Sequence, residues 1–256
     1  MKSIAYKKGA PIMETEVEHI IEWLQQQVEE ANVNGLLVGV SGGLDSAVVA
    51  NLIKHAFPDE SLGIILPLKN SEADIQDAHD VVDKCDIEHM TIDLTKTHET
   101  LWSEIQPHFT NRKNEENPLT DANLRARLRM GALYTVATDR RYLVVGTDNA
   151  SEWYTGYFTK YGDGGVDILP LVQYTKKEVR EMAAYLGVPK NIIKKNPSAD
   201  LWDGQTDETE MGTTYDKIDA YLNNDAIPKK DEDLIEKMHQ KTEHKRRIPP
   251  IYQRTR

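Results

Sequence analysis

Apolar and polar positions follow two patterns along this chain: short apolar runs, and longer segments in which apolar residues recur at helical spacing. Helical spacing over residues 17–28 predicts an amphipathic helix near the N-terminus. Four apolar runs predict buried strands, at residues 35–40, 61–68, 87–94 and 142–146. A shorter run at residues 167–171 predicts a fifth strand.

Segments with helical periodicity separate these strands, around residues 47–53, 75–82, 97–108 and 121–140. Thr175 and Glu178 form a capping box that opens a further helix, which Gly187 and Pro189 close. Strands that alternate with helices predict an α/β fold, with right-handed crossovers and a parallel β-sheet flanked by helices on both faces. Ligands of such folds gather at the carboxyl ends of the strands.

The turn after the first predicted strand has the sequence Ser-Gly-Gly-Leu-Asp-Ser, residues 41–46. Gly42 and Gly43 can take positive φ, so successive N–H groups can face one concavity at a helix N-terminus. Ser41 and Ser46 can add hydroxyl donors. Asp45 would repel a bare phosphate, so its presence predicts a Mg²⁺ ion between the two. The alternative is an ordinary glycine-rich turn, but this order resembles the loop of enzymes that split ATP into AMP and pyrophosphate.

A second polar segment follows the fourth predicted strand. Its Glu152 should lie at the same sheet edge as Asp45, where two carboxylates and phosphate oxygens would complete a magnesium site. The alternative is a surface acid in the first turn of a helix. Lys160 and Asp163 lie in a glycine-rich loop, which could hold a cation and an acid near a reacting group. The alternative is a solvated turn, since lysine, aspartate and glycine are common in turns.

Composition narrows the classes of function. The 256 residues are 39% hydrophobic and 29% charged, which is typical of a soluble globular protein, and we expect one domain over residues 1–256. The formal charge of −11 disfavours nucleic-acid binding and favours small-molecule substrates. The single cysteine, Cys85, excludes an intrachain disulfide. No apolar run is long enough to cross a membrane and no secretory signal is evident, so we expect a cytoplasmic protein.

Several motifs occur together in one order, at residues 41–46, 146–152, 158–165, 196–201, 207–210 and 242–246. In these motifs the chain resembles the ammonia-dependent NAD synthetases over nearly its whole length. The resemblance implies an adenine-nucleotide alpha-hydrolase-like (Rossmann-like) fold. It also implies the ATP-dependent amidation of deamido-NAD: the substrate carboxylate attacks the α-phosphorus of ATP, pyrophosphate leaves, and ammonia displaces AMP from the acyl-adenylate. The expected partners are therefore ATP, deamido-NAD and ammonia, with Mg²⁺ as cofactor.

The resemblance also implies roles for individual residues. Asp45 and Glu152 match magnesium ligands, and with Lys176 and Asp163, the acid near the ammonium site, they form the expected catalytic group. Contacts to ATP are implied for Gly39, Ser41, Gly42, Gly43, Asp45, Ser46, Thr147, Lys176 and Ser198. Contacts to deamido-NAD are implied for Arg127, Lys160, Asp167, His244 and Lys245.

From the residues alone, Arg127 reads as one of several solvated helix cations, and His244 and Lys245 read as favourable charges at the end of a helix. The chain departs from the family at Leu44, where glutamine is usual, and at Ser198, where threonine is usual. It also lacks the arginine that many relatives carry just before the Leu66–Pro67 pair. These departures leave the predicted reaction unchanged and put the affinity for ATP in question.

Other classes compete with this interpretation. A tRNA-modifying ATP pyrophosphatase shares the first motif but is expected to be basic and often has paired cysteines. A nucleotide sensor could keep the loop but has no need of the carboxylate pair, and a glutamine-dependent relative needs a further domain. The resemblance implies a homodimer. We also expect two polar segments, 110–121 and 199–211, to act as lids.

Overall fold

The computed structural model describes residues 13–109, 118–197 and 206–254. Four strands form one sheet: β1 (Gly35–Gly39), β2 (Ser61–Ile65), β3 (Glu88–Thr91) and β4 (Tyr142–Val144). All pairs are parallel and the order is β3-β2-β1-β4, which confirms the predicted parallel sheet. Each strand ends before its apolar run does.

The predicted fifth strand at residues 167–171 is wrong. Ile168 makes a single parallel bridge to Val145 and no ladder follows. The Asp167 carboxylate accepts the Val144 N–H at 2.8 Å, at the edge where a further strand would have to pair. Pro170 then has no N–H to donate, and the chain turns away.

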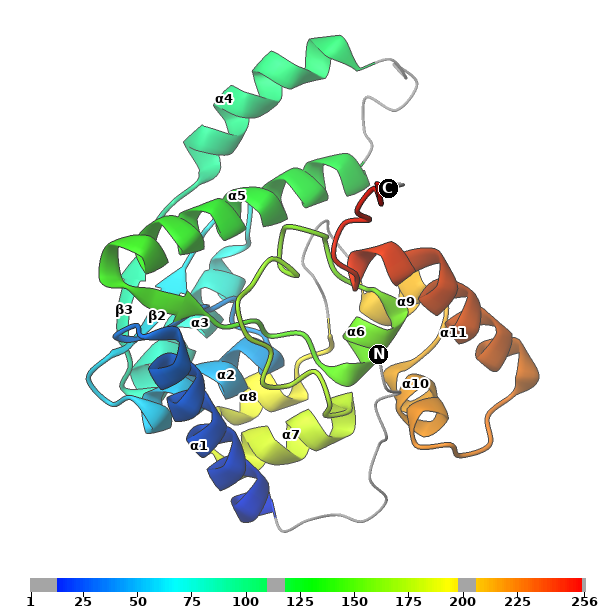
Figure 1. Ribbon diagram of the computed structural model, residues 1–256, viewed down its shortest axis with the longest axis horizontal. Helices are drawn as coiled ribbons and strands as arrows, with labels where there is room; N and C mark the ends of the chain where they lie inside the picture. The colour runs from blue at the N-terminus through cyan, green and yellow to red at the C-terminus, as the bar shows by residue number, and fades with distance from the viewer. Residues whose placement is uncertain (1–12, 110–117, 198–205, 255–256) are drawn as a thin grey trace.

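Helices cover both faces of the sheet, as expected (Figure 1). On one face lies α5 (Pro118–Arg140), whose Leu133 packs against the core of Leu37, Leu62 and Val144. The other face is covered by α2 (Leu44–Ala56) and α3 (Glu72–Cys85), with α1 (Met13–Ala31) and α7 (Lys176–Tyr185) packed outside α2. Leu36, Val38 and most of α2 form that core, so β1 is buried from both sides.

The helix predicted at residues 97–108 is α4 (Thr95–Ile105), followed by the short 3₁₀ helix η1 (Gln106–His108). Pro107 supports that change, because it cannot donate the hydrogen bond that would continue the α-helix. In Figure 1, α4 extends away from the sheet beyond α5. Part of the loop predicted at 110–121 is helical, since α5 begins at Pro118, and residues 110–117 lie outside the described residues.

The C-terminal part adds short helices at the carboxyl ends of the strands: α6 (Ala150–Thr155), α8 (Lys190–Lys194), α9 (Asp207–Met211), α10 (Tyr215–Leu222) and α11 (Lys229–Thr242), with the 3₁₀ helix η3 (Glu243–Lys245). Residues of α6, α9, α10 and α11 bury a separate apolar cluster that includes Ala150, Tyr215 and Ile235. No helix in the described part of the chain has the length and apolar character to cross a membrane.

The strand order indicates where a ligand site is expected. From β1 the chain goes to β2 and β3 on one side of the sheet and later returns to β4 on the other side. The loops that leave β1 and β4 therefore diverge at a switch point, where parallel sheets hold their ligands.

Candidate active site

The loop from β1 to α2 is shaped by its own hydroxyls and by Gly42. Ser46 Oγ accepts the Ser41 N–H at 3.2 Å and donates to the Gly43 carbonyl at 3.0 Å, while Ser41 Oγ accepts the Gly43 N–H at 3.2 Å. Gly42 has φ +80°, and a Cβ there would lie 2.8 Å from the backbone of Ala78 and of Asp74 in α3. Among the described residues no side chain caps α2, whose first N–H groups can therefore face an anion.

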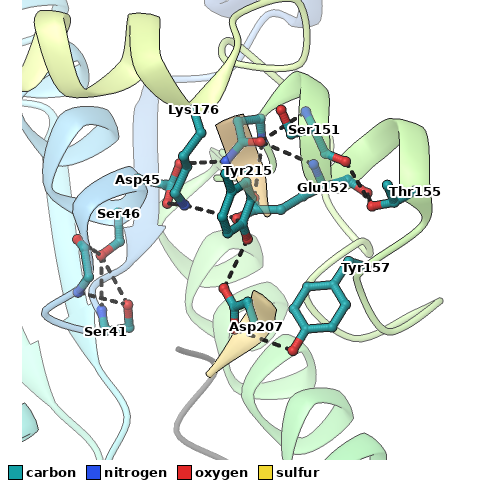
Figure 2. A network of polar contacts seen from close by, with 12 residues as sticks. Ser41, Asp45, Ser46, Ser151, Glu152, Thr155, Tyr157, Lys176, Asp207 and Tyr215 are labelled. Carbon is teal, nitrogen blue, oxygen red and sulfur yellow. Dashed lines mark hydrogen bonds and ion pairs between the residues drawn. The ribbon is translucent and has the colours of Figure 1, made fainter. Parts of the chain in front are cut away.

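Asp45 and Glu152 meet at one lysine ammonium (Figure 2). Lys176 Nζ lies 2.5 Å from Asp45 Oδ2 and 3.0 Å from Glu152 Oε1. Asp45 stands in the first turn of α2, Glu152 in the first turn of α6 and Lys176 at the first position of α7. The two carboxylates thus face one cleft, where one oxygen of each contacts the same ammonium.

Asn149, the N-cap of α6, connects these groups. Its Oδ1 accepts the N–H groups of Ser151 and Glu152, and Glu152 Oε2 accepts the Asn149 N–H at 3.2 Å, so the two form a capping box. Its Nδ2 donates to Asp45 Oδ1 at 2.8 Å. Helix capping therefore fixes both carboxylates, and Glu152 is not the exposed surface acid of the alternative interpretation.

Burial and mutual charge set the protonation behaviour of this cluster. Burial, with a contribution from Asp45, raises the pKa of Glu152 to about 7, although Lys176 opposes the shift. Burial acts against the charge of Lys176, but Asp45 and Glu152 outweigh it and raise the pKa of the lysine. Lys176 is 3% exposed and stays charged, held between two carboxylates.

A cavity of about 660 Å³ opens in front of the loop, within the range typical of sites for small molecules. The predicted residues that line it are Gly39, Ser41, Gly43, Asp45, Ser46, Arg127, Thr147, Glu152, Lys160, Asp163, Lys176, His244 and Lys245. Gly42 shapes the loop from behind, and Asp167 does not line the cavity, since its carboxylate accepts Tyr134 Oη at 2.9 Å and the Val144 N–H. Ser198 lies outside the described residues.

The basic residues at the far side of the cavity are tied to the loop of residues 156–165. Lys245 Nζ donates to the carbonyls of Gly156 and Phe158, and Lys160 Nζ donates to the His244 carbonyl at 2.6 Å. Arg127 is exposed on α5 and reaches the Lys160 carbonyl at 3.4 Å. His244 and Lys245 therefore lie on one wall of the cavity, far in sequence from the β1–α2 loop.

Two further carboxylates lie near this wall. Asp163 accepts the Thr159 N–H at 3.0 Å, and burial raises its pKa. Asp148 is 5% exposed, and its Oδ2 has no hydrogen-bond partner in the described part of the chain. Burial, followed by the charges of Asp163, Glu152 and Asp45, raises the pKa of Asp148. Both acids line the cavity, where their oxygens can accept hydrogen bonds from a cationic ligand.

Comparisons with known proteins decide the family. The family model described as NAD synthase matches residues 16–249. The NH(3)-dependent NAD(+) synthetase of Alkaliphilus oremlandii is 54% identical over 238 residues, which cover 91% of this chain and 95% of that protein. The chain belongs to the NAD synthase family.

Solved structures agree on the fold. The NMN synthetase of Francisella tularensis is 40% identical with a TM-score of 0.89, and the match covers 95% of this chain and 99% of that one. The NH3-dependent NAD synthetase of Campylobacter jejuni, in complex with the nitrate ion, is 27% identical with a TM-score of 0.75 and coverages of 95% and 100%. The predicted adenine-nucleotide alpha-hydrolase-like fold is confirmed, and a tRNA-modifying enzyme is not favoured.

Within this NAD synthase fold, the carboxylate pair fits a divalent cation. Carboxylate oxygens are the protein ligands that Mg²⁺ prefers, and it usually takes only one or two of them together with water and phosphate oxygens. In the described part of the chain, no three histidine, cysteine or acidic side chains group closely enough to hold a metal alone. A cation at Asp45 and Glu152 would thus depend on ATP oxygens to complete its shell.

Several residues of the site were not predicted. Asp148 has a sequence signal, because it directly follows a buried strand beside Thr147. Arg129 has no sequence signal that separates it from the other arginines of its helix, yet its guanidinium donates to the Leu66 carbonyl at 3.2 Å and to Asn70 Oδ1 at 2.8 Å, on the cavity wall. Asp207 lies in the motif at residues 207–210, although no role was predicted for it. Tyr215, which contacts both Glu152 and Asp207, has no signal in periodicity or spacing.

Proposed function

We propose that this chain amidates deamido-NAD to NAD with ATP and ammonia, and that Asp45, Glu152 and Lys176 are the centre of its ATP site. The observation that carries the proposal is the meeting of these three side chains beside the β1–α2 loop. Similarity to the NH(3)-dependent NAD(+) synthetases names the reaction. The loop amides and Lys176 supply the positive charge that a triphosphate requires.

In the first step, an oxygen of the nicotinate carboxylate attacks the α-phosphorus of ATP. The bond from this phosphorus to the bridging oxygen breaks, and pyrophosphate leaves with the electron pair. Negative charge grows on the leaving group, where the N–H groups of the β1–α2 loop, Ser41, Ser46 and Lys176 can stabilise it. A Mg²⁺ held by Asp45 and Glu152 would neutralise further phosphate charge.

In the second step, ammonia attacks the acyl carbon and AMP leaves. Ammonium must first lose a proton, and Asp163, which lines the cavity, is the proposed acceptor. Asp148 lines the same cavity, and its Oδ2 is a further acceptor for the N–H groups of ammonium.

The remaining substrate contacts are also proposals. Gly39, Gly43 and Thr147 line the cavity near the loop and fit the phosphates and ribose of ATP, and Gly42 supports them by allowing the turn. Arg127, Lys160, His244 and Lys245 form the basic wall suited to the phosphates of deamido-NAD. Asp167 contacts Tyr134 and Val144 and does not line the cavity, so its proposed contact to deamido-NAD rests on the family resemblance. The Ser198 hydroxyl is likewise assigned to ATP by resemblance alone.

A second substrate is favoured by one observation, the likeness to the NMN synthetase of Francisella tularensis at a TM-score of 0.89. Nicotinate mononucleotide carries the same carboxylate on the same ring, so the steps above apply to it unchanged. The two substrates differ only in the adenylyl half, which the basic wall would have to bind.

One competition experiment tests both possibilities. The purified chain is given ATP, Mg²⁺ and ammonium with equal amounts of deamido-NAD and nicotinate mononucleotide, and the products are quantified by mass spectrometry. We expect NAD to dominate, with one AMP and one pyrophosphate for each amide formed. Dominant NMN would support the second substrate, and ADP with phosphate would contradict the proposed chemistry.

We further propose that the chain works as a homodimer in the cytoplasm. The resemblance to the family supports the dimer, and small-molecule substrates found inside cells support the location. Light scattering on a size-exclusion column would give about twice the chain mass of 29.1 kDa if the dimer forms.

A further inference from the structure

Tyr215 lies directly behind the carboxylate pair, and its position is fixed from several sides. It is 1% exposed, opens α10 and packs in the apolar cluster with Ile218 and Ile235. Its backbone N–H donates to Glu208 Oε1 at 2.9 Å. The phenol oxygen therefore has a set place, which does not depend on solvent or substrate.

The hydroxyl contacts two carboxylates. It lies 3.1 Å from Glu152 Oε1 and 2.9 Å from Asp207 Oδ2 in α9 (Figure 2). Glu152 Oε1 thus accepts from both Tyr215 and Lys176, and Glu152 Oε2 accepts the Asn149 N–H. Glutamate has three rotatable side-chain bonds, and these contacts select one orientation of its carboxylate.

The ring of Tyr215 also contacts the lysine. Lys176 Nζ lies 4.8 Å from the ring centroid, a cation–π distance. One tyrosine thus holds both Glu152, through its hydroxyl, and Lys176, through its ring. These are the two groups whose relative position decides where a phosphate-bound cation can sit.

A tyrosine hydroxyl has one hydrogen to donate, and here two acceptors lie within its reach. When Glu152 Oε1 accepts from Tyr215, Asp207 is left without that donor. When a cation takes the lone pair of Glu152, the hydroxyl can turn to Asp207 without losing its hydrogen bond. Asp207 therefore gives the hydroxyl a second acceptor when a cation engages Glu152.

We propose that Tyr215 is a positioning residue that orients Glu152 and Lys176 for a divalent cation bound with ATP, and that Asp207 anchors its hydroxyl. This inference rests on the proposed role of Glu152 as a cation ligand. Partners that orient metal ligands commonly change metal affinity or activity by about 10- to 100-fold when removed. We expect an effect of that size here.

The test measures Mn²⁺ binding in the presence of an ATP analogue by electron paramagnetic resonance, for the wild-type chain and for Tyr215→Phe. We expect the Mn²⁺ dissociation constant to rise about 10- to 100-fold in the variant. The matched control is Tyr221→Phe in the same helix, whose hydroxyl contacts Glu236 and Tyr154 and not the site. It should stay within about twofold of wild type.

A Tyr215→Phe value within about twofold of wild type would overturn the inference, as would an equal loss in Tyr221→Phe. If the phenylalanine variant fails to fold, Asp207→Asn replaces it, because that change keeps the tyrosine and removes the charged anchor. Weaker Mn²⁺ binding in folded Asp207→Asn supports the inference, and unchanged binding contradicts it. Absence of Mn²⁺ binding in the wild-type chain would instead contradict the proposed function.

Discussion

At the scale of single residues, Lys176 determines how two buried carboxylates can coexist in the site. Asp45 and Glu152 would repel each other across a few ångströms if the ammonium between them were lost. Removing one partner of a buried ion group commonly costs about 3–5 kcal/mol, because the remaining charges stay buried and unpaired. With the catalytic role proposed for Lys176, catalysis and stability depend on the same side chain.

Lys176→Met should lower kcat by about 100-fold or more and should also lower the melting temperature. The neighbour Lys177 is exposed on the same turn of α7 and provides a matched control. In steady-state assays kcat of Lys177→Met should stay within about twofold of wild type, and thermal unfolding should give an unchanged melting temperature. Equal rates for the two variants would contradict the role of Lys176.

Local sequence settings predicted only part of this group. Asp45 follows a glycine-rich turn and Glu152 follows a strand end, whereas Lys176 was expected at the site from the family resemblance alone. The sequence could not show that Lys176 bridges the two acids, because Lys176 and Asp45 are 131 positions apart. Tyr215 was missed for the same reason, since nothing near it in sequence differs from an ordinary core tyrosine.

At the scale of elements, the first turns of α2 and α6 carry the two carboxylates of the proposed ATP site, and a capping side chain at α6 connects them. Asn149 caps α6 and donates to Asp45, so it serves local structure and the site together. The predicted fifth strand failed for local reasons. Its residues are apolar, but the side chain of Asp167 occupies the Val144 N–H and Pro170 has no N–H to donate, and a hydrophobic pattern shows neither effect.

Asn149→Ala should cost about 1 kcal/mol of stability through the lost cap and should also lower kcat, because Asp45 loses a donor. Ser71→Ala removes the equivalent residue of a capping box at α3. It should cost a similar amount of stability with little change in kcat. Chemical denaturation and steady-state assays separate the two, and unchanged kcat in Asn149→Ala would contradict the coupling.

Gly42→Ala should weaken ATP binding by about 10-fold or more, since φ is +80° and the new Cβ would lie 2.8 Å from the α3 backbone. Gly131 in exposed α5 has nothing within 4 Å of such a Cβ. Gly131→Ala should leave binding unchanged and raise stability by up to about 1 kcal/mol. Calorimetric titration with ATP checks the pair, and normal affinity in Gly42→Ala would argue against the loop as the phosphate site.

At the scale of the whole molecule, the parallel sheet brings distant segments to one edge. The order β3-β2-β1-β4 places the loops after β1 and β4 side by side, and the C-terminal helices then close the cavity with Lys245 and His244. The sheet and its layers could be predicted from alternating patterns. The fold of the C-terminal part could not, because short helices such as α9 and α10 have too few turns to show a clear period, and His244 and Lys245 were expected at the site from resemblance alone.

ATP should stabilise the whole fold only when a divalent cation is present. At a ligand concentration of about 100 times Kd, binding adds about 2.7 kcal/mol, which corresponds to roughly 5–10 °C in melting temperature for a chain of this size. Adding a chelator should abolish the shift, and Asp45→Asn should show little of it. A full shift in the presence of chelator would contradict a cation held by Asp45 and Glu152.

The central claim, that ATP is cleaved between its α- and β-phosphorus atoms by a carboxylate of deamido-NAD at this loop, has one direct test. Exchange of labelled pyrophosphate into ATP is measured without ammonia, with and without deamido-NAD, in the presence of Mg²⁺. We predict exchange only when deamido-NAD is present, and its loss in Asp45→Asn. Folded wild-type protein that shows no exchange, or shows it equally without deamido-NAD, would contradict the account.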